Sequence, residues 1–392
     1  MKKLVLLLVL VLSIYSVHAQ KNNRTSAFNY LRNGKLDKAK EFIDKTIEHP
    51  QTINDAKAWF YRGNIYLAIH MSELPAFKAL DENALAKSYE SYIKAQEFDE
   101  KKEFFADIFT NMFVISEQFY NLGVESFNHK NYLKAMQAFE SSAALTKEIG
   151  NLDTMALYNA GMTAELAEEN TDAKRIYKEL LGMNYQNPAI YSSMGGILLR
   201  EHDTLSAMNY VKDGRAIFPD DFNLLIIETN IYLNTQQTEC ALKNLELAMQ
   251  IDQNNPSIFF AVGTIYDQLK NSHPDDAANY LAKAEKAYMK SIELQSDYFD
   301  PIYNLGALYV NEAAQIIDKA NTLPLSEIKK YDMMKTQADE LLSKSLPYLE
   351  TAHEMLPSDL STMVSLKEIY TRLNMFDKMQ IMNNKIKELQ NR

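Results

Sequence analysis

The sequence predicts an all-α protein built from one antiparallel helix hairpin that is repeated along the chain. Two series of small residues lead to this prediction. The first recurs every 34 positions, at Gly161, Gly195, Thr229 and Gly263. The second follows the first at a distance of twelve positions, at Ala173, Ala207 and Ala241. A fixed period of this length is typical of helical repeat proteins, in which each period forms one hairpin.

A third observation concerns the glycines. Glycine inside a helix costs about 1 kcal/mol relative to alanine, so it persists there only where another backbone must approach closely. Six of the eleven glycines nevertheless occupy the first small position, namely Gly63, Gly123, Gly161, Gly195, Gly263 and Gly306. In the second helices a small residue is followed four positions later by a large apolar one, as in Ala135 with Phe139 and Ala173 with Tyr177. This pattern predicts that each large side chain packs where the two helices cross.

Two segments resemble the tetratricopeptide repeat (TPR) family. Residues 59–66 (Trp-Phe-Tyr-Arg-Gly-Asn-Ile-Tyr) are similar to the signature of its first helix, with Arg62 where leucine is usual, and residues 303–309 keep the Leu-Gly-x-x-Tyr core. The resemblance implies a right-handed α-solenoid, or superhelix, of about nine hairpins. Their small first-helix positions are Ala27, Gly63, Gly123, Gly161, Gly195, Thr229, Gly263, Gly306 and, although it is not small, Lys367.

Three hairpins are longer than the family's period. Twelve residues normally separate the two small positions, but the separations are larger from Gly63 to Ser88, from Gly263 to Ala284 and from Gly306 to Ser345. We therefore expect elongated hairpins near residues 64–87, 264–283 and 307–344, and a lengthened helix around 104–119. The largest should project by roughly 20 Å, as a docking element or as a tolerated elongation. Pro347 should kink or break its second helix.

The chain begins with the features of a signal peptide. Lys2 and Lys3 precede an apolar run that is too short to span a bilayer, and Ala19 stands where a signal peptidase cuts. We expect cleavage after Ala19 and export to the periplasm or the exterior of a bacterium. Gln20 replaces the cysteine that a lipoprotein needs, so neither a lipid anchor nor a transmembrane segment is expected in the mature chain.

The remaining chain, residues 20–392, is predicted to form a single solenoid. Its most regular repeats should span about 116–300, followed by the elongated hairpin at about 302–356 and a capping repeat at about 358–390. Terminal repeats diverge because one of their faces meets water rather than a neighbouring repeat. No stretch is left for a separate catalytic domain.

Composition excludes several kinds of function. The net charge of −11 and the absence of a basic block disfavour nucleic acid as a ligand. Cys240 is the only cysteine, so no intramolecular disulfide can form, and it is predicted to be a small buried residue. The histidines are dispersed and lack metal-ligand spacing, and we predict that they are solvated. We expect no metal, no cofactor and no catalytic residues.

The family resemblance also implies a binding surface. In TPR proteins the residues three before and one after the small residue of the first helix face a concave groove. Here those positions and their neighbours predict a groove that is aromatic and amide-rich, with few charges. Its candidate residues are Phe60, Asn64, Tyr120, Asn121, Tyr158, Asn159, Met162, Ile226, Asn230, Phe260, Thr264, Tyr303 and Asn304.

The groove composition favours a protein partner. Phe60 occupies the position of the lysine that clamps a peptide carboxylate in chaperone-docking members of the family, which excludes that subtype. Tyrosine, phenylalanine and asparagine suit a segment of another protein, extended or helical. Three alternatives remain: the aromatics pack against neighbouring repeats, the chain is a surface carbohydrate-binding protein on a TPR-like scaffold, or it is an undetected enzyme.

Overall fold

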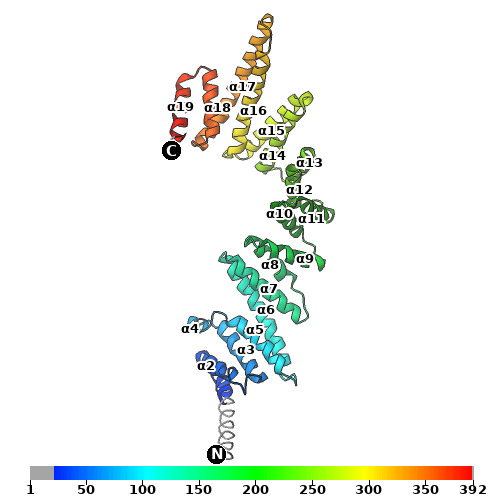
Figure 1. Cartoon of the computed structure of the whole chain (residues 1–392), viewed down its shortest axis with the longest axis vertical. Coiled ribbons are helices and arrows are strands. Elements are labelled where there is room, and N and C mark those ends of the chain that lie inside the picture. The colour runs from blue at the N-terminus through cyan, green and yellow to red at the C-terminus, as the bar shows by residue number, and fades with distance from the viewer. Residues whose placement is uncertain (1–21, 391–392) are drawn as a thin grey trace, which may run out of the picture. The chain divides into compact units, whose positions relative to one another are not determined.

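The computed structural model describes residues 22–390, which form helices, turns and connecting segments without any strand. The predicted all-α class is therefore confirmed. The chain divides into two compact units, one ending at Gln186 and the other beginning at Asn187, and each is a series of packed helix hairpins (Figure 1). The single continuous solenoid stays a prediction, and the predicted signal peptide, residues 1–19, lies outside the described residues.

The first unit contains four hairpins between residues 22 and 186. The first pairs a helix at 22–32 with α2 (Leu36–Ile47). The others pair α3 (Ala56–His70) with α5 (Ala84–Phe98), α6 (Phe105–Asn128) with α7 (Tyr132–Glu148), and α8 (Thr154–Leu166) with α9 (Asn170–Gly182). A short helix, α4 (Pro75–Lys78), lies between α3 and α5.

The second unit contains five hairpins. They pair α10 (Pro188–Arg200) with α11 (Thr204–Ile217), α12 (Phe222–Asn234) with α13 (Thr238–Ile251), α14 (Pro256–Ser272) with α15 (Ala277–Leu294), α16 (Phe299–Asn321) with α17 (Ile328–Met355), and α18 (Leu360–Arg372) with α19 (Phe376–Gln390). The described residues thus contain the nine hairpins that the sequence predicts.

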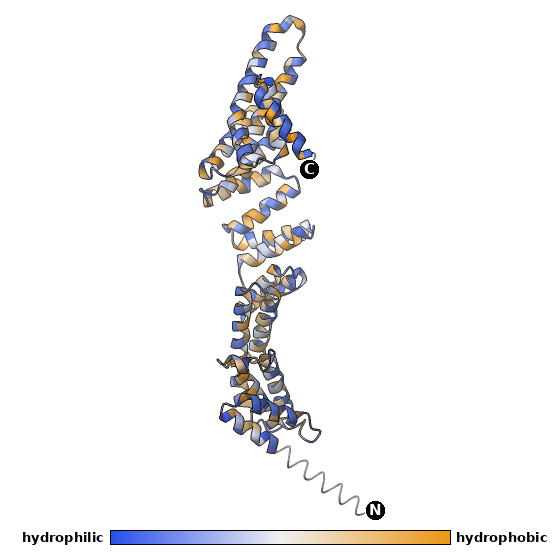
Figure 2. Ribbon diagram, turned by 90° about the vertical axis from the view of Figure 1, so that its left-hand side faces the viewer, coloured by the Kyte–Doolittle hydropathy of each residue, from blue (hydrophilic) through white to orange (hydrophobic). Residues whose placement is uncertain are grey.

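Helix starts and helix faces follow from the sequence. Many of the helices begin after an Asp or Asn side chain that accepts a hydrogen bond from a backbone N–H of the first turn, which satisfies one of the unpaired donors there. These caps are Asp55, Asn131, Asp153, Asn187, Asp203, Asp221, Asn255 and Asp359. Hydrophobic and hydrophilic residues alternate along the helices at helical spacing (Figure 2), so each helix can bury one face and expose another.

The glycines lie where the helices of a hairpin cross, as predicted. A Cβ atom on Gly161 would lie 2.6 Å from the Tyr177 ring, and one on Gly306 would lie 2.6 Å from the Leu349 side chain. The same relation holds at Gly63, Gly123, Gly195 and Gly263. In every case the contacting side chain lies four residues after the small residue of the second helix, which confirms the predicted packing.

Hairpins with the ordinary twelve-residue spacing share one turn. Seven positions after the small residue of the first helix, the backbone adopts a positive φ angle. The residues in this conformation are Gly34, Lys130, Glu168, His202, Gln236 and Asn374, with φ between 57° and 68°. Only one is glycine, although the left-handed region costs other residues roughly 1–2 kcal/mol.

Lys130→Gly is therefore expected to stabilise the α6–α7 hairpin by about 0.5–1 kcal/mol. Glycine relieves the strain of the positive φ angle. Part of this gain is offset because glycine also gives the unfolded chain more conformational entropy. The converse change, Gly34→Ala, should destabilise its hairpin by about 1 kcal/mol, since nothing lies within 4 Å of the added Cβ and only the backbone conformation changes. Native-state amide hydrogen exchange of each hairpin measures both effects. A destabilising Lys130→Gly together with a neutral Gly34→Ala would show that the turn is not strained.

Two of the three predicted elongated hairpins are confirmed, and the third is built differently. The helices of 264–283 and 307–344 are lengthened, since α14 and α15 have 17 and 18 residues and α16 and α17 have 23 and 28. At 64–87, however, α3 has only 15 residues and ends at His70. The extra residues form a connection around α4, because Pro75 can begin a helix but cannot continue one.

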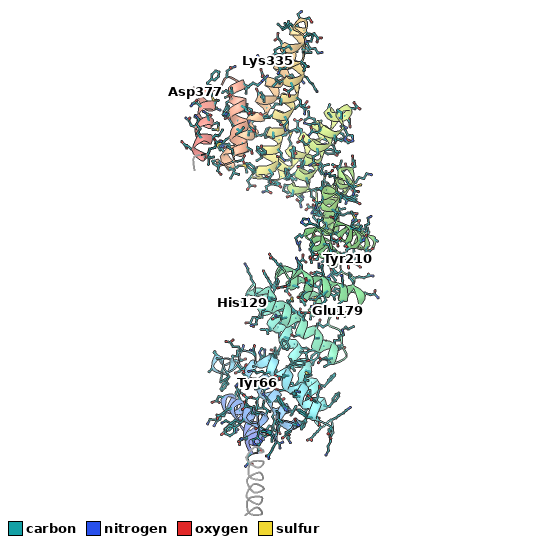
Figure 3. All side chains as sticks on the ribbon, in the orientation of Figure 1. Tyr66, His129, Glu179, Tyr210, Lys335 and Asp377 are labelled. Atoms are coloured by element: carbon teal, nitrogen blue, oxygen red, sulfur yellow. The ribbon has the colours of Figure 1, made fainter. Side chains whose placement is uncertain are left out.

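In the longest hairpin, the buried contact between the two helices continues into the part that projects. α16 and α17 lie side by side beyond the neighbouring helices (Figure 1) and share the fully buried Ala313 and Ala338. Lys335, labelled in Figure 3, is exposed on this projecting part. The break that was one of the two expectations at Pro347 does not occur, since α17 continues through this residue as one helix. Pro347 and Ser343 are both exposed, so water can reach the Ser343 carbonyl that lacks its amide partner.

Candidate functional site

Five candidate groove residues lie on α6 and α8, which are joined by a side-chain contact. Together with Val124, the position after Gly123, we call them the α6–α8 patch: Tyr120, Asn121, Val124, Tyr158, Asn159 and Met162. The Asn159 Nδ2 donates a hydrogen bond of 3.0 Å to the Tyr120 hydroxyl, which joins the two helices. Asn121 is exposed and Val124 is 39% exposed, while the other four are half-buried. The patch therefore combines accessible apolar carbon with an accessible amide.

The aromatic rings of this patch are held in place from behind. The Tyr120 ring meets the edge of Phe139 with centroids 5.2 Å apart, and the Tyr158 ring lies 6.2 Å from that of Tyr185. Such contacts restrict each ring and lower the entropy that a partner would have to remove on binding.

The predictions for Phe60 and Asn64 need correction. Phe60 is only 9% exposed and stacks on Phe104 with centroids 4.8 Å apart, because the connection before α6 folds back over it. The Asn64 Oδ1 accepts hydrogen bonds from the Tyr92 hydroxyl (2.5 Å) and the Asn111 Nδ2 (3.1 Å). Phe60 is thus part of the core rather than open to a partner, and the Asn64 carbonyl is used within the fold.

In the second unit, the candidate residues on α14 and α16 are also partly engaged. The Phe260 ring lies 5.5 Å from that of Tyr298, the Thr264 hydroxyl donates to the Phe260 carbonyl (3.1 Å), and Tyr303 stacks on Phe299. Burial raises the pKa of Tyr288 to about 12, although hydrogen bonding with Thr264 and Asn304 opposes the rise.

On α12, Ile226 is half-buried and Asn230 is exposed. The candidate groove residues of α12, α14 and α16 in the second unit are therefore less accessible than those of the α6–α8 patch.

Arg62, the departure from the TPR signature, has a structural role. Its side chain is buried, with Nε 3.2 Å from an oxygen of Asp44 and Nη1 2.7 Å from the Ser91 hydroxyl. Tyr66, labelled in Figure 3, donates from its hydroxyl to the same carboxylate at 2.9 Å. Burial and the Asp44 charge raise the pKa of Tyr66 above its usual range. Arg62 thereby ties the second hairpin to the first.

The titratable groups do not converge on a chemical site in the part of the chain that the structure describes. Within residues 22–390, no three His, Cys, Asp or Glu side chains are placed to hold a metal ion. Cys240 is half-buried rather than buried. His353 contradicts the predicted solvated role, since it is 9% exposed and its Nε2 lies 2.9 Å from the Lys385 Nζ. Burial and this ammonium group lower its pKa.

Two surface features were missed by the sequence analysis. One is a hollow of about 930 Å³ between α13, α14 and α15, with Met249, Phe259 and Val262 among its lining residues. The other is a row of exposed phenylalanines on α6, at positions 105, 109 and 113. Their four-residue spacing was a usable signal, but Phe104 and Phe119 in the same stretch are not exposed, so phenylalanine alone does not identify the open face.

The crossing glycines, the repeated turn and the hairpin pairing define a TPR-like helical repeat protein, the class that the sequence predicts. The solved structures that resemble this chain include two described as TPR proteins. YrrB, described as a TPR protein with an unusual peptide-binding site, has 17% identity and a TM-score of 0.38, and the match covers 55% of this chain and 98% of YrrB. MamA (residues 41 to the end) from Desulfovibrio magneticus RS-1 has 17% identity and a TM-score of 0.37, over 50% and 96% of the two chains. TTC0263, a thermophilic TPR protein from Thermus thermophilus, has 19% identity and a TM-score of 0.35, over 49% and 98%.

No protein-family model matches the sequence, and no curated protein matches it.

Across residues 22–390, none of the helices combines the length and the apolar character needed to cross a bilayer.

Proposed function

We propose that this protein is a non-catalytic, exported scaffold that binds a segment of a partner protein, and that the α6–α8 patch is its main contact. The observation that carries the proposal is the accessible surface around the Tyr120–Asn159 hydrogen bond, where Asn121 and Val124 are exposed on the face that the sequence assigns to binding. Export is supported by the signal-peptide features of residues 1–19.

The chemistry of the patch suits a peptide. Tyrosine rings offer a large apolar area with few rotatable bonds, and asparagine amides can pair with both the N–H and the C=O of an extended backbone. The patch contains no ionised side chain, so recognition there should depend weakly on salt. Ile226, Asn230, Phe260, Thr264, Tyr303 and Asn304 are proposed to make secondary contacts in the second unit.

A matched pair of variants tests the proposal. Tyr120→Ala/Tyr158→Ala should reduce partner capture from the bacterial envelope fraction by about tenfold or more, because buried tyrosines often dominate binding energy. The measurement is affinity capture with the mature chain followed by quantitative mass spectrometry. Leu205→Ala, which removes a 76%-exposed apolar side chain from α11, serves as the control.

The outcomes separate the alternatives. Unchanged capture by a folded Tyr120→Ala/Tyr158→Ala variant would contradict the proposal. Loss of helical circular dichroism would instead show that these rings serve mainly to pack neighbouring repeats. Micromolar binding on a glycan array that the same double variant abolishes would favour the carbohydrate-binding alternative.

A further inference from the structure

The N-terminal half of α6 carries three phenylalanines on successive turns, Phe105, Phe109 and Phe113, which we call the α6 stripe. Their exposed fractions are 52%, 45% and 54%. The four-residue spacing places them on one face, and the Phe105 and Phe109 ring centroids lie 6.3 Å apart. The stripe extends over about 12 Å. Single exposed apolar residues are ordinary on a protein surface, but a contiguous row of aromatic rings marks a place of interaction.

The stripe lies on a part of α6 that extends past the start of α8, the first helix of the next hairpin. α6 has 24 residues and α8 has 13. The Tyr120–Asn159 hydrogen bond fixes the register of these two helices. In that register α8 begins near residue 116 of α6, so the turns that carry the stripe extend past its start.

The hydrophobic core beside α6 is formed without the three phenylalanine side chains of the stripe. An adjacent side of the same turns carries Ile108 and Met112, which are 0% and 3% exposed and pack in one cluster with Phe60 and Phe104. This half of α6 is therefore anchored through one face while its aromatic face meets solvent. Substitution of the exposed rings should leave the fold intact.

We propose that the α6 stripe binds an amphipathic helix of another protein, with apolar side chains on successive turns and flanking lysines or arginines. The choice of a helix follows from continuity with an existing contact, since the first helix of the next hairpin, α8, already meets the Tyr120 end of α6 through the Tyr120–Asn159 hydrogen bond. A second helix can continue along it, with apolar residues three or four apart meeting the rings at their spacing of one helical turn.

The charge of the partner follows from the charge of α6. This helix contains no lysine or arginine, and its charged residues are Asp107, Glu117 and Glu125, all exposed. Glu117 follows Phe113 by one helical turn and so continues the line of the stripe, whereas Asp107 lies on the far side of the helix from it. A basic side chain at that end of the bound helix would complement Glu117. A second copy of the chain would bring the same acidic helix, and like charges would oppose that pairing.

This surface is an addition to the α6–α8 patch and uses none of its residues, so the two proposals can fail separately. The probe is a fluorescein-labelled 18-residue peptide of leucine and lysine, with leucines at i, i+3, i+4 and i+7 spacing. One comparison peptide has the same composition in shuffled order, and another has glutamate in place of lysine. Binding to the mature chain is followed by fluorescence anisotropy.

Only the amphipathic Leu/Lys peptide should bind, and Phe109→Asp should weaken it by about tenfold or more. Phe105→Ala/Phe109→Ala/Phe113→Ala, which introduces no charge, should have a similar effect. Glu117→Lys should weaken binding of this peptide and strengthen binding of the glutamate peptide, whereas Asp107→Lys, on the far side of α6, should have a smaller effect. Leu205→Asp in α11 and Tyr120→Ala/Tyr158→Ala should leave it unchanged.

Two results would overturn the proposal. One is equal binding of the Leu/Lys peptide by the wild-type chain, Phe109→Asp and the triple alanine variant. The other is a wild-type dimer in analytical ultracentrifugation that Phe109→Asp converts to a monomer, which would assign the stripe to contact between two copies.

Discussion

Asp44→Ala is expected to destabilise the first two hairpins by about 2–3 kcal/mol. The substitution leaves the buried Arg62 guanidinium without its carboxylate partner and removes the acceptor of the Tyr66 hydroxyl. Loss of one member of a fully buried ion pair costs about 3–5 kcal/mol. The expected figure is lower because the Asp44 side chain is 24% exposed, so water can partly replace it. Native-state hydrogen exchange of α2 and α3 measures the change.

A double-mutant cycle isolates the cause. Arg62→Leu, which introduces the residue usual at this position in TPR proteins, should change stability by only about 1 kcal/mol, because the 24%-exposed Asp44 keeps Lys40 and the Tyr66 hydroxyl as partners. In that background Asp44→Ala should lose most of its effect. Equal costs of Asp44→Ala with and without Arg62 would mean that the ion pair is not what Asp44 contributes.

Gly161→Val should destabilise the α8–α9 hairpin by about 3 kcal/mol. The new side chain must enter space occupied by the Tyr177 ring, since even its Cβ would lie 2.6 Å from that ring. Tyr177 is 2% exposed, so moving its ring aside would displace other packed atoms. Overpacking of this kind costs about 1–3 kcal/mol or more, which exceeds the gain in helix propensity over glycine. Hydrogen exchange of the α8 and α9 amides reports the local stability.

Gly182 provides the matched control. It also lies in a helix of this hairpin, but nothing lies within 4 Å of an added Cβ. Gly182→Ala should therefore be neutral or stabilising by up to about 1 kcal/mol. A Gly161→Val chain as stable as the wild type would refute the explanation given above for the six crossing glycines.

The helix pairing was predictable because it depends on local spacing. The position of Gly161, the distance of twelve to Ala173 and the four further residues to Tyr177 all follow from how two helices cross. The same spacing showed which hairpins are stretched. It did not show how 64–87 is built, because the same extra residues can lengthen two helices or form a connection, and the position of Pro75 decides between them.

The candidate site was less predictable, because exposure depends on what the neighbouring elements cover. Phe60 and Tyr120 occupy equivalent repeat positions, yet Phe60 is buried under Phe104 while Tyr120 remains half-exposed. Only the length of α6 and the course of the segment before it create this difference. The α6 stripe depends on the same mismatch in helix length, which no single repeat contains.

The shared turn has a consequence for engineering. Within each unit, Lys130, Glu168, His202, Gln236 and Asn374 occur at the same step of their hairpins, between two helices whose contacts lie elsewhere. The α16–α17 hairpin shows that this connection accepts many extra residues while the helices remain paired. An epitope tag or a fluorophore-binding peptide inserted after Glu168 or Gln236 should therefore leave the flanking helices folded, and would give each unit its own reporter.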